Sequence, residues 1–188
     1  SAPRKSGDAT LKQQLAESRA QQAATAAILK VIARSPSDVQ PVFDAIAKNA
    51  MRLLRAWSVV VVRFDGELLH FGAARGALPD TEQKVRESFP VSPREYNRFG
   101  GRAIIQRSAQ QIPDCRADAD PQVRKVARLR GFRASLSVPI LRAGKPLGSI
   151  TVTRAEPGAF PKSEVDFLRA FADQAVIAIE NVQRFNET

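Results

Sequence analysis

The chain of 188 residues has few of the side chains from which catalytic and metal sites are usually built, with one cysteine, Cys115, and one histidine, His70. A single cysteine excludes an internal disulfide bond and a thiol redox cycle, which needs a resolving partner. These two residues also form no cluster of zinc ligands, and they are isolated from each other in the sequence. We therefore expect no metal site and no catalytic residue in this chain.

Long hydrophobic runs are missing as well. No segment reaches the roughly 20 apolar residues of a membrane-spanning helix, and none has the pattern of a secretion signal. The sequence therefore predicts a cytoplasmic protein without direct membrane insertion.

Acidic residues are outnumbered, with 19 Asp and Glu against 29 Lys and Arg and a net charge of +10. Clustered cations can indicate nucleic-acid binding, because they release counterions from the phosphate backbone. Here the basic residues are spread from Arg4 to Arg184, and few aromatic residues lie among them to stack on bases. A solvated basic surface is the favoured interpretation, and nucleic acid is not an expected partner.

Apolar residues make up 44% of the chain, enough for one hydrophobic core with length left over for extended helices. Residues 1–7 are polar and unpatterned, and we expect a disordered end there. Helical patterns predict a first helix over residues 8–35 and a last helix over residues 163–188. Pro161 prevents the last helix from starting earlier, and Ser163 is its predicted N-terminal cap. Residues 37–162 form the predicted core between them.

Both terminal helices carry apolar side chains at alternating spacings of three and four, the pattern of a coiled-coil seam. The first seam has a polar middle, so we expect it to be weak and able to shift register. The last helix has no stop signal. We expect the two helices to join two copies of the chain into a homodimer through Leu11, Leu15, Leu29, Ile32, Phe171, Ala175, Ala178, Val182 and Phe185.

Strand patterns fill much of the predicted core. An apolar run over residues 59–64 can pair with residues 68–74, and residues 133–141 can pair with residues 146–154. Short helices are predicted over residues 81–87, 101–106 and 121–130, with a brief strand over residues 110–114. Tight hairpins at both ends of this series favour an α+β fold with an antiparallel sheet over a doubly wound parallel sheet.

Six segments of the sequence are familiar when taken together. They are Ser-Asp-Val-Gln-Pro-Val-Phe-Asp-Ala-Ile at 37–46, Arg-Phe-Asp-Gly at 63–66, Gly-Arg-Ala-Ile at 101–104, Ile-Pro-Asp at 112–114, Val-Pro-Ile-Leu at 138–141 and Phe-Ala-Asp-Gln-Ala-Val-Ile-Ala-Ile-Glu-Asn at 171–181. With these segments, residues 27–187 resemble the GAF sensory domains of bacterial two-component sensor histidine kinases and related cyclases. The resemblance implies a PAS-like antiparallel sheet with the first and last helices packed on one face and a small-molecule pocket on the other. It also implies helices that continue into an output domain of a longer chain.

The resemblance also allows kinds of GAF domain to be compared. Members that resemble phytochromes attach a bilin through a cysteine at a position that holds Arg124 here, so we do not expect a covalent bilin. Members that bind cyclic nucleotides have Asn-Lys where this chain has Thr153-Arg154, although Phe160 and Glu164 keep part of the motif. A cyclic-nucleotide-binding domain of a cyclase or phosphodiesterase stays open as an alternative. Members that reduce free methionine sulfoxide use several cysteines, and one cysteine cannot run that cycle alone. No cofactor or ligand is identified by these comparisons.

The turn over residues 141–145 predicts which side chains of the second hairpin share a face. A three-residue loop with Gly144 in the left-handed conformation would set Leu141 opposite Lys145. This register sets Ser137 opposite Ser149 and Ser135 opposite Thr151. One face then carries hydroxyl groups, with Thr153 at its rim, and the resemblance implies that this face borders the pocket.

The loop over residues 88–101 would lie over that pocket, and it adds Tyr96, Phe99 and Arg102 to the candidate ligand-binding residues. Two alternatives stay open, because the hydroxyl groups can be satisfied within the sheet and Arg102 can be a surface residue of a helix. The leading hypothesis is a non-catalytic sensory domain, and the second is a structural dimerisation module without a ligand. The two differ in whether side chains such as Phe89 and Phe99 fill the cavity.

Overall fold

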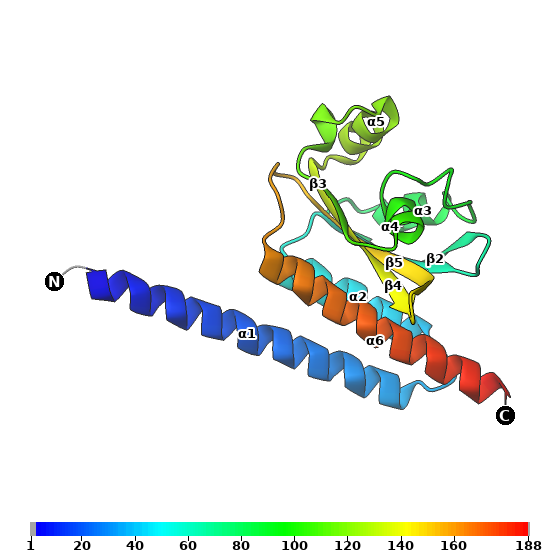
Figure 1. The fold of residues 1–188 in the computed structure, drawn as a ribbon, viewed down its shortest axis with the longest axis horizontal. Helices are drawn as coiled ribbons and strands as arrows, with labels where there is room; N and C mark the ends of the chain where they lie inside the picture. The colour runs from blue at the N-terminus through cyan, green and yellow to red at the C-terminus, as the bar shows by residue number, and fades with distance from the viewer. Residues whose placement is uncertain (1–2, 188) are drawn as a thin grey trace.

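The computed structural model describes residues 3–187 and contains a five-stranded antiparallel sheet with helices on both faces (Figure 1). The strands are β1 (Ser58–Phe64), β2 (Leu69–Gly76), β3 (Gln110–Ile112), β4 (Ala134–Arg142) and β5 (Lys145–Arg154). They lie in the order β2-β1-β5-β4-β3. The helices are α1 (Pro3–Arg34), α2 (Gln40–Leu53), α3 (Thr81–Arg86), α4 (Gly100–Gln106), α5 (Pro121–Arg130), α6 (Lys162–Glu187) and a 3₁₀ turn, η1 (Cys115–Ala117).

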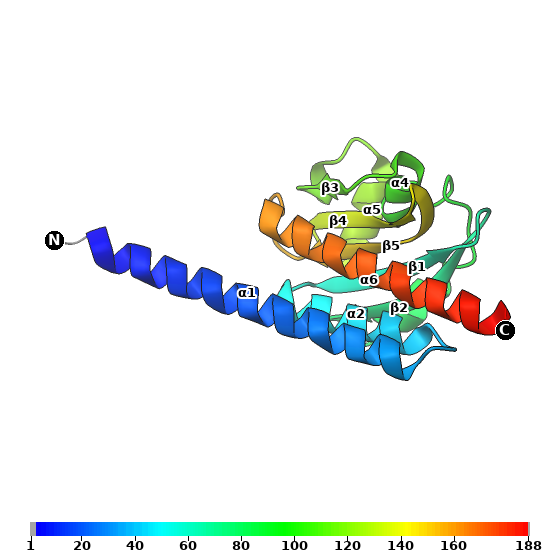
Figure 2. The same cartoon turned by 60° about the horizontal axis from the view of Figure 1, so that its bottom comes forward.

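Helices α2 and α6 cover one face of the sheet, and α3, α4 and α5 lie on the opposite side (Figure 1). Helix α1 packs on α2 and α6 as an outer layer (Figure 2). The last helix therefore lies on the sheet as predicted, but its neighbour there is α2, and the first helix lies outside this pair. The N-terminal half of α1 extends beyond the rest of the domain (Figure 2).

The main hydrophobic core lies between the sheet and these helices. Every second residue of the central strands points into it, as the alternation of side chains along a strand requires. Leu136 and Ile150 contribute from the sheet, while Phe43 and Phe171 contribute from the helices, and all four are almost completely buried. Burial of large apolar side chains on this face therefore holds the terminal helices to the sheet.

The terminal helices differ from the prediction in what their apolar stripes contact. Phe171, Ala175, Ala178 and Ile32 are buried within a single chain, so the prediction that they form a dimer seam is wrong for these residues. Val182 is half-buried. The remaining members of the predicted seam, Leu11, Leu15, Leu29 and Phe185, have exposed side chains.

The helix ends differ as well. Helix α1 begins at Pro3, so residues 3–7, predicted to be a disordered end, belong to it, whereas residues 1–2 lie outside the described residues. Helix α6 begins at Lys162, one residue before the expected Ser163. The amides of Glu164 and Val165 donate to the carbonyl of Pro161, which places Ser163 inside the first turn instead of at the cap.

At the turn of the β4–β5 hairpin, Lys145 lies opposite Arg142 and not opposite Leu141 as predicted, and from Ile140 away from the turn the pairing is shifted by two residues from the predicted register. Its turn has two residues, Ala143 and Gly144, both with positive φ, and an irregularity between Ile140 and Leu141 places one extra residue on β5. Ser137 therefore lies opposite Thr151, not Ser149, and Ser135 lies opposite Thr153. Because the shift is even, each side chain stays on its predicted face.

Candidate functional site

A cavity of about 220 Å³ lies on the face of the sheet opposite α2 and α6. Strands β1 and β5 form its floor, the loop before α4 forms one wall, and the end of α5 with the residues after it forms the other. Polar groups from all three parts converge on it. Its lining residues are Ser58, Val60, Ser88, Tyr96, Arg98, Phe99, Val126, Arg130, Phe132, Thr151 and Thr153.

The hydroxyl groups of the floor form two pairs. The oxygens Ser58 Oγ and Thr153 Oγ1 lie 2.5 Å apart, and Ser137 Oγ lies 2.8 Å from Thr151 Oγ1. In each pair, one hydroxyl donates its hydrogen to the other. The accepting hydroxyl therefore keeps its own hydrogen, and both oxygens keep acceptor lone pairs. The floor can therefore accept and donate hydrogen bonds while its internal pairs stay intact.

Four of the eight predicted ligand-binding residues line this cavity: Tyr96, Phe99, Thr151 and Thr153. The other four do not. Ser137 is buried next to Thr151 on the neighbouring strand β4, Ser135 accepts a hydrogen bond from the thiol of Cys115 at 3.7 Å, and Ser149 is buried beneath Gly100. Arg102 is half-buried on α4 and is absent from the lining.

Two glycines allow α4 to pack closely, Gly100 against the sheet and Gly101 against the preceding loop. A Cβ atom added to Gly100 would lie 2.5 Å from Ser149 Oγ, and one added to Gly101 would meet the Tyr96 carbonyl oxygen. Such distances leave no room for any side chain at these positions. The glycine pair therefore determines how closely the loop with Tyr96 and Phe99 approaches the sheet.

Sequence reasoning missed four polar residues of the cavity: Ser58, Ser88, Arg98 and Arg130. Extending the β1–β5 pairing would have found Ser58, because it lies opposite Thr153. Arg98 lies between the two aromatic residues that the sequence analysis selected. Arg130 was predicted within a basic helix, but no pattern in the sequence indicates that the last residue of this helix borders the cavity.

The electrostatic environment of the cavity is basic, since its lining includes Arg98 and Arg130 and contains no Asp or Glu. Arg98 Nε lies 3.6 Å from Asp120 Oδ2, a long ion pair in which both groups are partly exposed. Burial raises the pKa of Tyr96 above its ordinary value, and the nearby Arg130 opposes this shift. Tyr96 therefore keeps its phenolic hydrogen at neutral pH.

Comparisons with known proteins agree with this architecture. The GAF domain family matches residues 36–180, more than three quarters of the chain. The chain belongs to the GAF domain family. No curated protein matches this GAF domain.

Solved structures with the same fold come from proteins of different activity. A methyl-accepting chemotaxis protein, residues 122 to 287, is 21% identical with a TM-score of 0.68, covering 88% of this chain and 99% of the other. Free methionine-R-sulfoxide reductase from Neisseria meningitidis, solved with its substrate, is 17% identical with a TM-score of 0.67, covering 87% and 90%. The chromophore-binding domain of a bacteriophytochrome from R. palustris is 14% identical with a TM-score of 0.65, covering 88% and 62%. At these identities, the likeness shows the fold alone.

The residues that kept part of the cyclic-nucleotide motif do not line the cavity of this GAF domain. Arg154 donates to the Leu54 carbonyl oxygen at 2.6 and 3.2 Å and pairs with Glu164 Oε2 at 2.8 Å. Its guanidinium lies 4.5 Å from the centre of the Phe160 ring. These contacts join the end of β5 to the end of α2 and to the first turn of α6.

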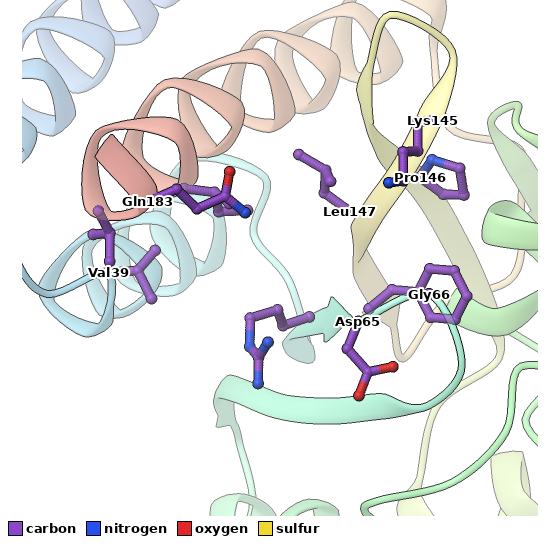
Figure 3. Close-up of a pocket in the computed structure, with 11 residues that line it drawn as sticks. Val39, Asp65, Gly66, Lys145, Pro146, Leu147 and Gln183 are labelled. Carbon is purple, nitrogen blue, oxygen red and sulfur yellow. The ribbon is translucent and has the colours of Figure 1, made fainter. Parts of the chain in front are cut away.

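A second, larger hollow of about 470 Å³ lies where the end of α6 meets the hairpin turns (Figure 3). Val39 and Gln183 lie on its helical side, Lys145 and Asp65 on its hairpin side, with Leu147 between them (Figure 3). We place the candidate site in the smaller cavity, because several hydrogen-bonding groups converge there on an apolar space.

Among the described residues of the GAF domain, no group of three or more His, Cys, Asp and Glu side chains has the arrangement of a metal site. No helix in the described part of the chain combines the length and the apolar character needed to cross a membrane.

Proposed function

We propose that this GAF domain is the sensory part of a longer signalling protein, in which it binds a small molecule without chemically changing it. The observation that carries this proposal is the cavity. Although Tyr96 and Phe99 project over the sheet, a volume of about 220 Å³ stays open beside them. A purely structural module has no need for a space in which hydroxyl, phenol and guanidinium groups converge.

The terminal helices offer a route from the cavity to an output domain. Thr153 borders the cavity, and the next residue, Arg154, contacts α2 at Leu54 and α6 at Glu164. A ligand that favours one position of β5 therefore also favours one position of these helices, which is a population shift. A coupling of about 1–3 kcal/mol between the two positions is typical of allosteric proteins.

The output that we propose is a histidine kinase of a bacterial two-component system, acting in the cytoplasm as a homodimer. The exposed side chains of Leu11, Leu15 and Leu29 on α1 support the dimer, because α1 presents them away from α2 and α6. The dimer contact in this proposal is made by α1, and the buried residues of α6 hold that helix to its own domain.

Native mass spectrometry of protein incubated with a cell extract tests ligand binding. We expect a retained small molecule, and we expect Ser88→Trp, at the exposed mouth of the cavity, to abolish it. Ser37→Trp, an exposed substitution in the loop before α2, is the matched control and should keep the molecule. Protein that retains nothing, before or after the substitutions, would support the ligand-free dimerisation module instead.

Sedimentation tests the dimer. The double variant Leu11→Asp, Leu15→Asp should be a folded monomer, because aspartate pairs repel across a helical interface. Leu129→Asp, at a fully solvated position of α5, should leave the dimer unchanged. A persistent dimer of the double variant would place the interface elsewhere.

A further inference from the structure

The arginines of the cavity indicate the charge of its ligand. No carboxylate of the described residues forms an ion pair with Arg130, although its charge contributes, after the hydrogen bond from Lys84, to the lowered pKa of Asp80. Arg98 is held only by the 3.6 Å contact with Asp120. The second carboxylate oxygen of Asp120 accepts a hydrogen bond from the Gln122 amide at 2.9 Å, so this side chain is shared between two partners. Two guanidinium groups thus border a partly enclosed space without a carboxylate in its lining.

The backbone at Arg130 is fixed in place. Trp57 Nε1 donates to the Arg130 carbonyl oxygen at 2.8 Å, and the next residue, Gly131, ends α5 in the left-handed conformation with φ of 85°. A side chain that starts from an anchored position loses less freedom when it binds a ligand. The placement of Arg130 at the cavity is therefore set before any ligand arrives.

The walls between these arginines are aromatic and apolar. The Phe99 and Phe132 rings meet edge to face, with centroids 5.6 Å apart, and Val60 and Val126 complete the apolar lining. The cavity of about 220 Å³ is below the range of about 300–1,000 Å³ that is usual for drug-sized ligands. The space suits a single ring better than an extended tetrapyrrole.

We propose that the cavity takes a small aromatic oxyanion, whose ring lies between Phe99 and the sheet and whose carboxylate or phosphate group binds the guanidinium groups of Arg98 and Arg130. A guanidinium matches either oxyanion with two parallel hydrogen bonds. The Tyr96 hydroxyl and the hydroxyl pairs of the floor supply further donors. This inference rests on the proposed sensory function, since it specifies the ligand class of the same cavity.

Matched pairs of compounds test the charge. Benzoate and phenyl phosphate are compared with benzamide and benzyl alcohol by isothermal titration calorimetry on the full chain. We expect at least one of the two anions to bind about tenfold or more tightly than either neutral compound, a difference typical of a charge-assisted hydrogen bond. The two anions separate a carboxylate ligand from a phosphate ligand.

Two variants of α5 separate a specific contact from general charge. Arg130→Gln should weaken binding of the preferred anion by about tenfold or more. Arg128→Gln removes the same charge from an exposed position outside the cavity and should leave binding within about twofold of the unchanged protein. Circular dichroism of both variants confirms that they fold.

The outcomes distinguish this inference from the proposed function. If the neutral compounds bind as tightly as the anions, or if neither anion binds, the oxyanion proposal is wrong. If a cell extract still yields a retained neutral molecule that Ser88→Trp abolishes, the sensory function stands without it. If no molecule of any kind is retained, the sensory function fails as well.

Discussion

Along β4 and β5, the two faces of the sheet are both buried but chemically opposite. The side chains that point toward α2 and α6 are aliphatic, whereas the opposite face carries the hydroxyl groups of Ser135, Ser137, Ser149, Thr151 and Thr153. The first face gains stability from burial and tight packing. On the second face, Ser135, Ser137, Thr151 and Thr153 form hydrogen bonds, whereas Ser149 Oγ has no partner among the described residues, and an open volume lies beside them. One strand can therefore contribute both to stability and to binding, because its side chains alternate between the two faces of the sheet.

The largest expected effect comes from neighbouring residues of β4 that lie on opposite faces. Leu136→Ala should lower the free energy of unfolding by about 2–5 kcal/mol, because it leaves a void in a fully buried core. Ser137→Ala removes one hydrogen bond to Thr151 and should cost only about 1 kcal/mol. Urea denaturation measures both. Equal losses would show that the cavity face is packed as tightly as the helix face.

The contacts by which Arg154 links β5 to α2 and α6 should have the next largest effect. Arg154→Met keeps much of the side-chain volume but removes the bonds to Leu54 and Glu164, and we expect a loss of about 1.5–3 kcal/mol. Arg169→Met, at an exposed position of α6, should change stability by less than about 0.5 kcal/mol. A small loss at Arg154 would argue against its role in linking β5 to the helices.

The close approach of α4 to the sheet provides a reciprocal test. Gly100→Ala should destabilise the protein by about 1–3 kcal/mol, because its methyl group would overlap Ser149 Oγ. Adding Ser149→Ala removes that oxygen and should restore part of the loss. Thermal unfolding of both single variants and the double variant gives the interaction energy. Additive losses would mean that another contact limits position 100.

The smallest effect concerns pH. Asp114, after β3, pairs with Arg133, before β4, and hydrogen bonds from Arg133 hold the pKa of Asp114 below its ordinary value of 3.8. Because the folded pKa is lowered, the pair stabilises the fold above about pH 4 and loses this contribution as the pH falls through the folded pKa. Asp114→Asn should therefore flatten the acid limb of stability against pH. An unchanged limb would show that other carboxylates dominate it.

The sequence predicted the order and type of the elements well, because hairpin turns and side-chain alternation are local signals. It also identified the hydroxyl face correctly despite a register error of two, since an even shift keeps Ser137 and Thr151 on the same side. Local signals could not decide what the apolar stripe of α6 contacts. Phe171 and Ala175 fit a coiled-coil seam and a domain core equally well, and the fold places them in the core.

The cavity walls were harder to predict than its floor. The loop over residues 88–99 has no repeating pattern, so its path depends on long-range contacts such as those of Gly100 and Gly101 with the sheet and the loop itself. That path brings Arg98 to the cavity and leaves Arg102 on α4 outside it. Strand pairing follows rules of spacing, whereas the approach of a loop to a sheet requires the complete tertiary structure.

The single tryptophan of the chain lies beside the candidate site, where its indole N–H donates to the Arg130 carbonyl oxygen. The indole ring also lies against Gly131, since a Cβ atom added at Gly131 would lie 3.1 Å from Trp57 Cζ2. A ligand that binds the Arg130 side chain contacts a residue whose carbonyl oxygen accepts a hydrogen bond from this indole. The protein thus contains its own fluorescent reporter, and the emission of Trp57 should follow occupancy of the cavity without an added label.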